Sequence, residues 1–256
     1  MKITVLNENT CRTGLPCEHG LSLYIETKAH NILFDMGQTD IFARNAIGLG
    51  ADLSRADIAV LSHGHYDHGG GLKTFLALNS NAKVYMNSRA FEPHYNGEKY
   101  IGLDTSLKDS GRIEFISDVT ALGDGLTLYP AKLIPDKYVS PPSGLTAVKG
   151  GEKVPDDFSH EQYLLIEEDG KRVLISGCSH KGIVNITDYF RPDILIGGFH
   201  LSKITDENEL DDCAKHLDYY GTLYYTCHCT GTEQYNFMAS KMKNLRYIST
   251  GETINL

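Results

Sequence analysis

Four side chains that can bind a metal lie within six positions of one another, in the segment SHGHYDHGGG at residues 62–71. His63, His65 and His68 contribute imidazoles, and Asp67 contributes a carboxylate. Neutral imidazoles and carboxylates are ligands that Zn(II), Fe(II) and Mn(II) take in proteins. A single histidine after a strand is usually a capping or surface residue, but four ligands at this density predict a metal centre.

Further histidines follow the ends of three other predicted strands. His180 follows VLISGCS, His200 follows ILIGGF, and His228 follows LYYTC. Strand ends at one edge of a sheet converge in space, and open sheets keep their sites there. We therefore expect two ions with three ligands each, taken from His63, His65, Asp67, His68, His180 and His228. The histidines expected to be capping or surface residues are His19, His30, His94, His160 and His216.

The elements that must position these ligands form two similar halves. In the first half, the spacing of apolar residues predicts strands at 2–8, 21–27, 31–37, 56–62 and 82–88 and helices at 41–50 and 71–80. The second half predicts a hairpin at 161–176, strands at 193–199, 222–228 and 245–251, and helices at 182–190, 204–221 and 232–244. Thr205 is expected to cap the helix at 204–221. This order favours an α/β (α+β) fold, a sandwich of two mixed sheets with outer helices.

The region from about 91 to 160 is less regular than its flanks and contains six of the eight prolines. Strands resume on both sides of it, so we expect one domain over 1–256 with 91–160 as an irregular inserted loop region. Its Pro- and Gly-rich part, at 133–154, is expected to close over the site as a lid that excludes water.

The composition of the chain indicates which kinds of partner it can bind and in which cell compartment we expect it. The formal net charge is -9 and no run of lysine or arginine exceeds two residues, so a nucleic-acid backbone would be repelled. No apolar stretch approaches the roughly 20 residues that span a bilayer, and the first residues read as a strand, not as a signal segment. Six cysteines at low density indicate free thiols. We expect a cytoplasmic protein with a small-molecule substrate and no nucleic-acid or membrane partner, and the oligomeric state is left open.

The segment at 62–70 resembles the H-x-H-x-D-H signature of the metallo-β-lactamase superfamily. The earlier ILFDMG resembles the strand and Asp-x-Gly turn that precede that signature, and the resemblance extends over nearly the whole chain. It implies a four-layer αββα sandwich. It also implies that His63 and His65 bind a first ion and that Asp67, His68 and His228 bind a second.

The third ligand of the first ion is open between two histidines. The usual third histidine of the superfamily falls near His160, which precedes a predicted strand. His180 lies beside a strand end, and for that reason we favour it.

Three cysteines lie close to predicted ligands. Most hydrolytic relatives have a carboxylate that bridges both ions where this chain has Cys178, which either ligates a metal or is a small buried thiol. Cys227 and Cys229 flank His228 at alternate positions, so both are expected to point away from it and to serve in packing.

The motifs GLSLYIE, ILFDMGQT, SGCSH, GGFHL and HCTG resemble the branch that contains 7,8-dihydropterin-6-methyl-4-(β-D-ribofuranosyl)aminobenzene-5'-phosphate synthase. Many members of this branch are called metal-dependent hydrolases. The resemblance implies one or two divalent ions, with zinc as first choice and iron or manganese as alternatives. It implies a hydrolase that attacks a small ester, lactone or phosphate-bearing substrate through a metal-bound hydroxide. The alternative is a transferase that condenses a dihydropterin with an aminobenzene ribose phosphate, and a metal-binding oxidoreductase ranks third.

Two residues are expected to take part in the chemistry. Asp67 would orient the attacking water and accept its proton. His200, in GGFHL, would stand near the substrate, either as an acid for the leaving group or as a structural histidine.

Overall fold

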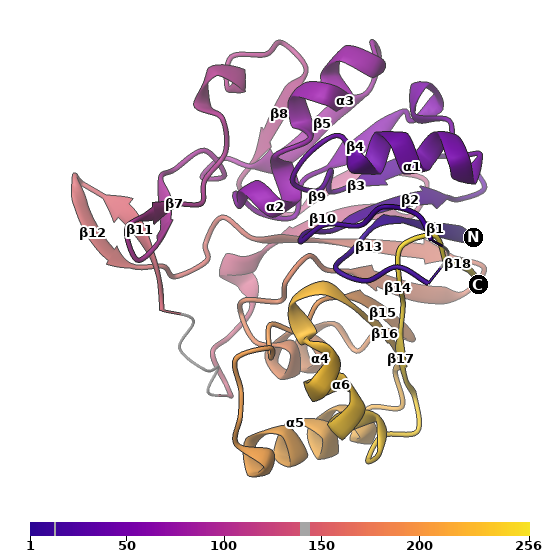
Figure 1. Ribbon diagram of the computed structural model, residues 1–256, viewed down its shortest axis with the longest axis vertical. Coiled ribbons are helices and arrows are strands. Elements are labelled where there is room, and N and C mark those ends of the chain that lie inside the picture. The colour runs from indigo at the N-terminus through magenta and orange to yellow at the C-terminus, as the bar shows by residue number, and fades with distance from the viewer. Residues whose placement is uncertain (13, 139–143) are drawn as a thin grey trace.

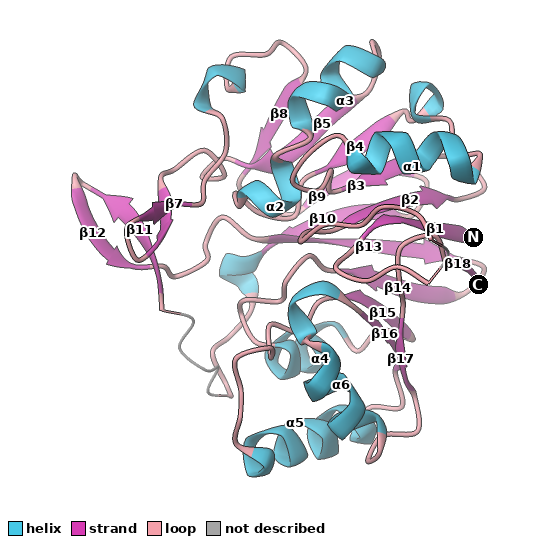
Figure 2. Ribbon diagram, in the orientation of Figure 1, coloured by secondary structure: helices cyan, strands magenta, loops and turns pink. Residues whose placement is uncertain are grey.

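The computed structural model describes residues 1–12, 14–138 and 144–256, so 139–143 of the expected lid lie outside the described residues. Two sheets face each other and helices cover both outer faces (Figures 1 and 2). The first sheet has the strand order β18 (Thr253–Asn255), β1 (Lys2–Asn7), β2 (Ser22–Glu26), β3 (Asn31–Phe34), β4 (Ile58–Val60), β5 (Lys83–Asn87) and β8 (Ile113–Ile116). The second has the order β17 (Leu245–Tyr247), β16 (Leu223–Thr226), β15 (Ile194–Gly197), β14 (Lys171–Ile175), β13 (Gln162–Glu168), β10 (Leu126–Pro130) and β9 (Thr120–Gly123).

Both sheets are mixed, as expected. Pairing is parallel from β3 through β4 and β5 to β8, and again from β14 through β15 and β16 to β17. The remaining pairs in these two sheets are antiparallel, including β1 with both β2 and β18. The first and last strands of the chain are therefore neighbours (Figure 1).

The helices belong to two layers. The helices on the first sheet are α1 (Ile41–Leu49), α2 (Tyr66–Gly69) and α3 (Leu72–Leu78), and those on the second are α4 (Ile183–Phe190), α5 (Glu207–Tyr219) and α6 (Thr232–Ala239). Short 3-10 turns are η1 (Leu53–Arg55), η2 (Thr105–Leu107), η3 (Ala131–Leu133) and η4 (His228–Thr230). Helix α5 begins after Asp206, whose side chain accepts a hydrogen bond from the amide of Asn208. The expectation that Thr205 caps this helix is therefore wrong by one residue.

Successive side chains of a strand belong to different hydrophobic cores, one between the two sheets and one between a sheet and its helices. This explains why four layers form. In β13, Leu164 and Ile166 belong to the core between the sheets, whereas Tyr163 and Leu165 pack against the outer helices. Side chains of a strand point to opposite faces in turn, so a strand buried on both faces must be apolar at every position. The αββα sandwich expected from the sequence is confirmed.

A third sheet corrects the expectation that 91–160 is an irregular loop region. It contains β12 (Glu152–Pro155), β11 (Leu145–Lys149), β6 (His94–Asn96) and β7 (Lys99–Tyr100). The same region supplies β8, β9 and β10 to the two main sheets. These strands have two to five residues each, too few for a period of two to stand out from the sequence.

The parallel strands aim their carboxyl ends at one edge of the sandwich. After β4, a short loop carries His63 and His65 and the helix α2 carries Asp67 and His68, while the segments after β14, β15 and β16 carry His180, His200 and His228. This arrangement brings together ligands from both halves of the chain. In the part of the chain that the structure describes, no helix combines the length and apolar character needed to cross a bilayer.

Candidate metal centre

The loop after β4 holds residues 63–68 on a tight path that glycines make possible. A Cβ atom at Gly64 would lie 2.1 Å from the carbonyl oxygen of Ala90, and one at Gly71 would lie 2.2 Å from that of Met36. Backbone therefore passes directly against both positions, and a larger residue would displace the ligand loop.

Three buried imidazoles face one another in what we call the first cluster, His63, His65 and His180. One ligand atom of each ring lies within 4.8 Å of the other two. The Nε2 atoms of His63 and His65 and both ring nitrogens of His180 are buried and have no hydrogen-bond partner within the described residues. A buried polar atom without a partner costs about 1–3 kcal/mol. Three such rings around one point fit a divalent ion with nitrogen ligands.

The surroundings of the first cluster keep its rings in the metal-binding form. Burial lowers the pKa of His63, His65 and His180 well below the usual value, and neighbouring histidines lower it further. Neutral imidazole is the form that ligates metals. The hydroxyl oxygen of Ser62 lies 2.8 Å from Nδ1 of His63, which leaves Nε2 available.

Asp67, His68 and His228 form the second cluster. Oδ2 of Asp67 lies 3.4 Å from Nε2 of His228 and 3.9 Å from Nε2 of His68, and the two Nε2 atoms are 3.2 Å apart. Ligands about 2.0–2.1 Å from one tetrahedral zinc ion are about 3.4 Å apart. The second cluster therefore also has the dimensions of a metal site.

In the second cluster, the Nδ1 atom of each histidine has a polar partner that fixes the orientation of the ring. Nδ1 of His68 lies 2.6 Å from Oδ2 of the buried Asp35, and Nδ1 of His228 lies 2.8 Å from Oδ1 of Asn9. Ligating histidines typically use their second nitrogen in this way. Burial alone would raise the pKa of the Asp67 carboxyl, but His68 and other neighbouring histidines lower it well below its usual value, so Asp67 is ionised.

His19 corrects one expectation. It was predicted to be a capping or surface residue, and its side chain is indeed about half exposed, but its Nε2 lies 3.1 Å from Oδ2 of Asp67. The loop between β1 and β2 therefore reaches the metal centre. Sequence spacing gave no sign of this contact, because the loop is brought there by tertiary packing.

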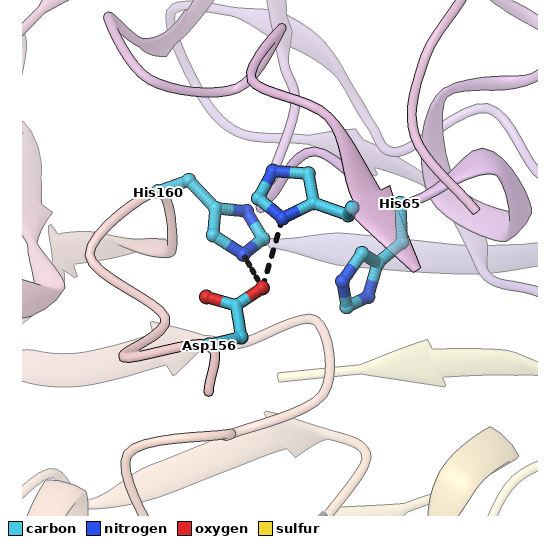
Figure 3. Close-up of side chains that lie close together, drawn as sticks. His65, Asp156 and His160 are labelled. Atoms are coloured by element: carbon cyan, nitrogen blue, oxygen red, sulfur yellow. Dashed lines mark hydrogen bonds and ion pairs between the residues drawn. The ribbon is translucent and has the colours of Figure 1, made fainter. Parts of the chain in front are cut away.

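His160 and His94 also lie beside the first cluster, in a group with His65 and Asp156. Figure 3 shows His160 and Asp156 next to His65. The amide of Gly64 donates to Nδ1 of His160 at 2.9 Å, so the proton of the neutral ring lies on Nε2. That Nε2 is 3.3 Å from Oδ2 of Asp156, close enough for an ion pair though poorly aligned for a hydrogen bond. Nδ1 of His94 lies 2.8 Å from the same oxygen. Both buried histidines thus share one carboxylate beside His65 instead of lying at the surface.

Two thiols adjoin the second cluster. Sγ of Cys178 lies 3.2 Å from Nε2 of His68, and the ligand atoms of Cys178, His228 and Cys229 all lie within 4.8 Å of one another. The expectation that Cys229 points away from His228 is wrong, because β16 ends at Thr226 and the turn η4 abolishes the alternation.

Cys227, by contrast, packs in the core between the sheets, as expected.

His200 connects the clusters to a cavity. Its ring lies 4.3 Å from that of His180 between centroids, and its backbone has a φ of 53°, which a non-glycine residue rarely adopts. Both histidines line a cavity of about 410 Å³ next to α4 and α5, whose walls include Tyr138 and Phe199. The metal centre therefore opens on a space large enough for a small molecule.

Two buried glutamates hold the loops that carry the late histidines. Oε1 of Glu161 accepts from the amide of His180 at 2.9 Å, and Oε2 of Glu8 accepts from the amide of His228 at 3.1 Å. Glu161 also accepts from the hydroxyl of Tyr163 at 2.6 Å. These carboxylates act on backbone, so they position ligands without touching an ion.

Replacing Glu161 with glutamine is expected to loosen the His180 loop. The side-chain amide of glutamine would place an N–H donor where the glutamate has an acceptor oxygen, so that donor would face other donors. We expect this to lower the free energy of unfolding by about 1–3 kcal/mol. The melting temperature should fall by roughly 2–4 °C for each kcal/mol lost in a chain of this size. Metal affinity, measured by chelator competition, should fall as well.

The matched control is Glu167→Gln on β13, the strand that begins directly after Glu161, where the glutamate is exposed and pairs with Arg172 at the surface. This variant should melt as the wild type does. A Glu161→Gln protein with wild-type melting temperature and metal affinity would show that the carboxylate does not position His180.

The fold and the site together define an αββα sandwich with residues of metal-ligating types gathered at one edge. The family model described as the metallo-beta-lactamase superfamily matches residues 15–217, and the chain belongs to this superfamily.

Relatives extend this likeness along the whole chain. An uncharacterised protein of Methanocaldococcus jannaschii, MJ0448, is 31% identical over 265 residues, covering 99% of this chain and 100% of the relative. The 7,8-dihydropterin-6-methyl-4-(β-D-ribofuranosyl)-aminobenzene-5'-phosphate synthase of the same organism is 27% identical over 275 residues, covering 95% of this chain and 92% of the enzyme. Among solved structures, Tm1679, described as a metal-dependent hydrolase of the beta-lactamase superfamily, has a TM-score of 0.87 and 30% identity, covering 100% and 99% of the two chains.

Proposed function

We propose that this protein is a metal-dependent hydrolase that acts on a small ester, lactone or phosphate-bearing molecule. The observation that carries the proposal is the convergence of unpartnered, buried imidazole nitrogens in the first cluster, beside an ionised Asp67 and open to a cavity. The similarity to Tm1679 supports the hydrolytic class. The acidic chain, with a net charge of -9, supports a small-molecule substrate over a nucleic acid.

In this proposal the first cluster holds the first ion and the second cluster holds the second. Zinc is the first choice because imidazole and carboxylate suit it, with iron or manganese as alternatives. Such an ion lowers the pKa of water and polarises a carbonyl or phosphoryl oxygen. We also propose a cytoplasmic location, where the thiols beside the second cluster would stay reduced.

Two side chains of the protein would take part in the reaction. Asp67, buried and ionised, would orient the attacking water and accept its proton. His200, at the wall of the cavity, stands where it can protonate a leaving group.

The second candidate is a transferase that joins a dihydropterin to an aminobenzene ribose phosphate. The full-length similarity to the synthase of Methanocaldococcus jannaschii favours it. In that reaction the ions would hold a substrate oxygen while a leaving group departs, and hydrolysis of simple esters would not occur.

Metal analysis of freshly purified protein, followed by a substrate panel, tests both candidates. The panel should contain phosphoesters, lactones and dihydropterins with and without an aminobenzene ribose phosphate. We expect one to two ions per chain and turnover of at least one ester, lactone or phosphate that stops after chelation.

Two outcomes would count against the hydrolase. Folded protein that neither contains nor binds divalent ions would remove the proposed centre. Turnover only when both transferase substrates are present would replace hydrolysis with condensation.

The third ligand of the first ion is open to direct test. His180→Ala is expected to lower metal affinity by on the order of tenfold or more, because its ring nitrogens are buried without a partner in the described residues and one of them lies in the first cluster. His160→Ala should leave metal affinity near the wild-type value. The amide of Gly64 donates to Nδ1 of His160, so the ring proton lies on Nε2 and neither nitrogen is available to an ion. Isothermal titration of both apo variants with zinc gives the comparison.

His160→Ala should show its effect on stability instead, because Oδ2 of the buried Asp156 would lose one of the two histidines that it contacts, at a cost of about 1–3 kcal/mol. If His160→Ala loses the ion and His180→Ala retains it, the ligand is His160 and our assignment is wrong.

A further inference from the structure

The cavity beside the metal centre is lined largely by rings and by apolar side chains. His180 and His200 line it on the side of the first cluster, and Tyr138 and Phe199 add two more rings. Apolar side chains from α4 and from the segment after β15 complete much of the remaining wall. Rings pack well against other flat groups, either offset or edge to face. A lining of this kind therefore favours an occupant with a flat ring.

The carboxylates in this lining give the cavity a negative character. Glu209 and Asp212 are three positions apart on α5, so they share one face of the helix, and both line the cavity. The described residues of the lining include no lysine or arginine. A cleft lined by charges of one sign attracts the opposite sign and repels its own. The cavity is therefore suited to an uncharged or positively charged group.

Neighbouring cations compensate these carboxylates only in part. No ion pair joins Glu209 to another residue in the part of the chain that the structure describes. Nζ of Lys215 is 3.6 Å from Oδ1 of Asp212 but 2.5 Å from Oδ2 of Asp211, so its main partner is Asp211. A positive charge on an occupant would thus meet one unpaired and one weakly paired carboxylate.

A buried asparagine holds Tyr138 at the wall of the cavity. The amide of Tyr138 donates to Oδ1 of Asn185 at 2.7 Å, and Nδ2 of Asn185 donates to the carbonyl oxygen of Tyr138 at 2.9 Å. Asn185 lies in α4 and is 2% exposed. The ring of Tyr138 meets that of His216 edge to face, with 5.2 Å between centroids. A tyrosine fixed in this way can bind a flat or cationic group at little cost in conformational entropy.

We propose that this cavity binds a flat ring of the substrate, uncharged or positively charged, while the bond to be broken lies at the metal centre. The inference rests on the proposed function and narrows its substrates to esters, lactones or phosphate esters of such ring compounds. A phosphate or carboxylate at the far end of the molecule would meet Glu209 and Asp212, so substrates of that kind are disfavoured.

Three small probes separate the effect of charge from that of shape. Benzamidinium is a flat cation, benzenesulfonate is a flat anion of similar size, and cyclohexanecarboxamidinium carries the cationic group of the first on a ring that is not flat. In zinc-loaded protein, chemical-shift titration should show that benzamidinium binds roughly fivefold or more tightly than either of the others. Bound zinc cannot produce this order, because its charge would favour the anion.

Variants of the lining should change this order in different ways. Glu209→Gln combined with Asp212→Asn should abolish the preference for benzamidinium over benzenesulfonate. Tyr138→Ala should reduce the preference for benzamidinium over cyclohexanecarboxamidinium. The controls are Glu207→Gln and Tyr219→Ala on the same helix, outside the described lining, and both should bind the probes as the wild type does.

Benzenesulfonate that binds as tightly as benzamidinium would overturn the inference. A preference for benzamidinium that persists when both carboxylates are removed would overturn it too, as would a wild type that does not bind benzamidinium. These outcomes concern the cavity and leave the hydrolase proposal standing. Protein that binds no divalent ion would instead refute the proposed function.

Discussion

A double change of His63 and His65 to alanine is expected to remove the first ion and reduce turnover to background. Both rings direct an unpartnered, buried Nε2 atom into the first cluster, so their loss leaves His180 alone there. Three ligands are needed for a catalytic zinc site, and one cannot hold it. Metal content by mass spectrometry and turnover of the substrate found in the panel give the result.

The apo form of this variant should keep its fold. The ligands lie in loops at strand ends, and the two Nε2 atoms have no hydrogen bonds to lose. Far-ultraviolet circular dichroism should therefore match that of the wild-type apoprotein. His30→Ala, in the turn between β2 and β3, is the control and should retain both metal and activity. Unchanged metal content in the double variant would remove the first cluster from the proposed centre.

Asp67→Asn is expected to lower kcat by roughly 10² or more, the scale of a removed general base. Asparagine keeps the size and one oxygen of the side chain but removes the charge and the capacity to accept a proton. The first ion should persist because the first cluster is intact. Metal stoichiometry measured beside kcat and KM separates the loss of chemistry from the loss of an ion.

The same variant tests the second cluster. Because Asp67 belongs to it, the second ion should bind more weakly in Asp67→Asn. The control is Asp57→Asn, at a surface pair with His30, which should leave kcat unchanged. Wild-type kcat with full metal content would show that Asp67 is not the proton acceptor.

Local spacing made part of the site predictable. Residues 63–68 can be read from the sequence because a strand, a tight loop and a helix follow one another without a break. His180, His200 and His228 could be placed because parallel strands end at a common edge. The mixed sheets were predictable for a similar reason, since long apolar runs such as β13 mark strands buried on both faces.

Contacts made by tertiary packing were not predictable. His19 reaches Asp67 from a loop, and His94 reaches Asp156 from a sheet whose strands are too short to recognise. Cys229 was misplaced because strand alternation was extended past Thr226 into a turn. In each case the error concerns where a backbone segment lies or ends, which distant packing decides.

Residues far apart in the sequence contribute to the metal centre, and this determines when the centre can form during synthesis. His228 is held by contacts with Glu8 and Asn9, residues about 220 positions earlier, and β1, which ends directly before Glu8, pairs with β18. A ribosome-bound chain that still lacks its final strands cannot offer these ligands in place. The second cluster is therefore expected to take its ion only after β16 and β18 have been synthesised, whereas the first cluster needs no residue beyond His180.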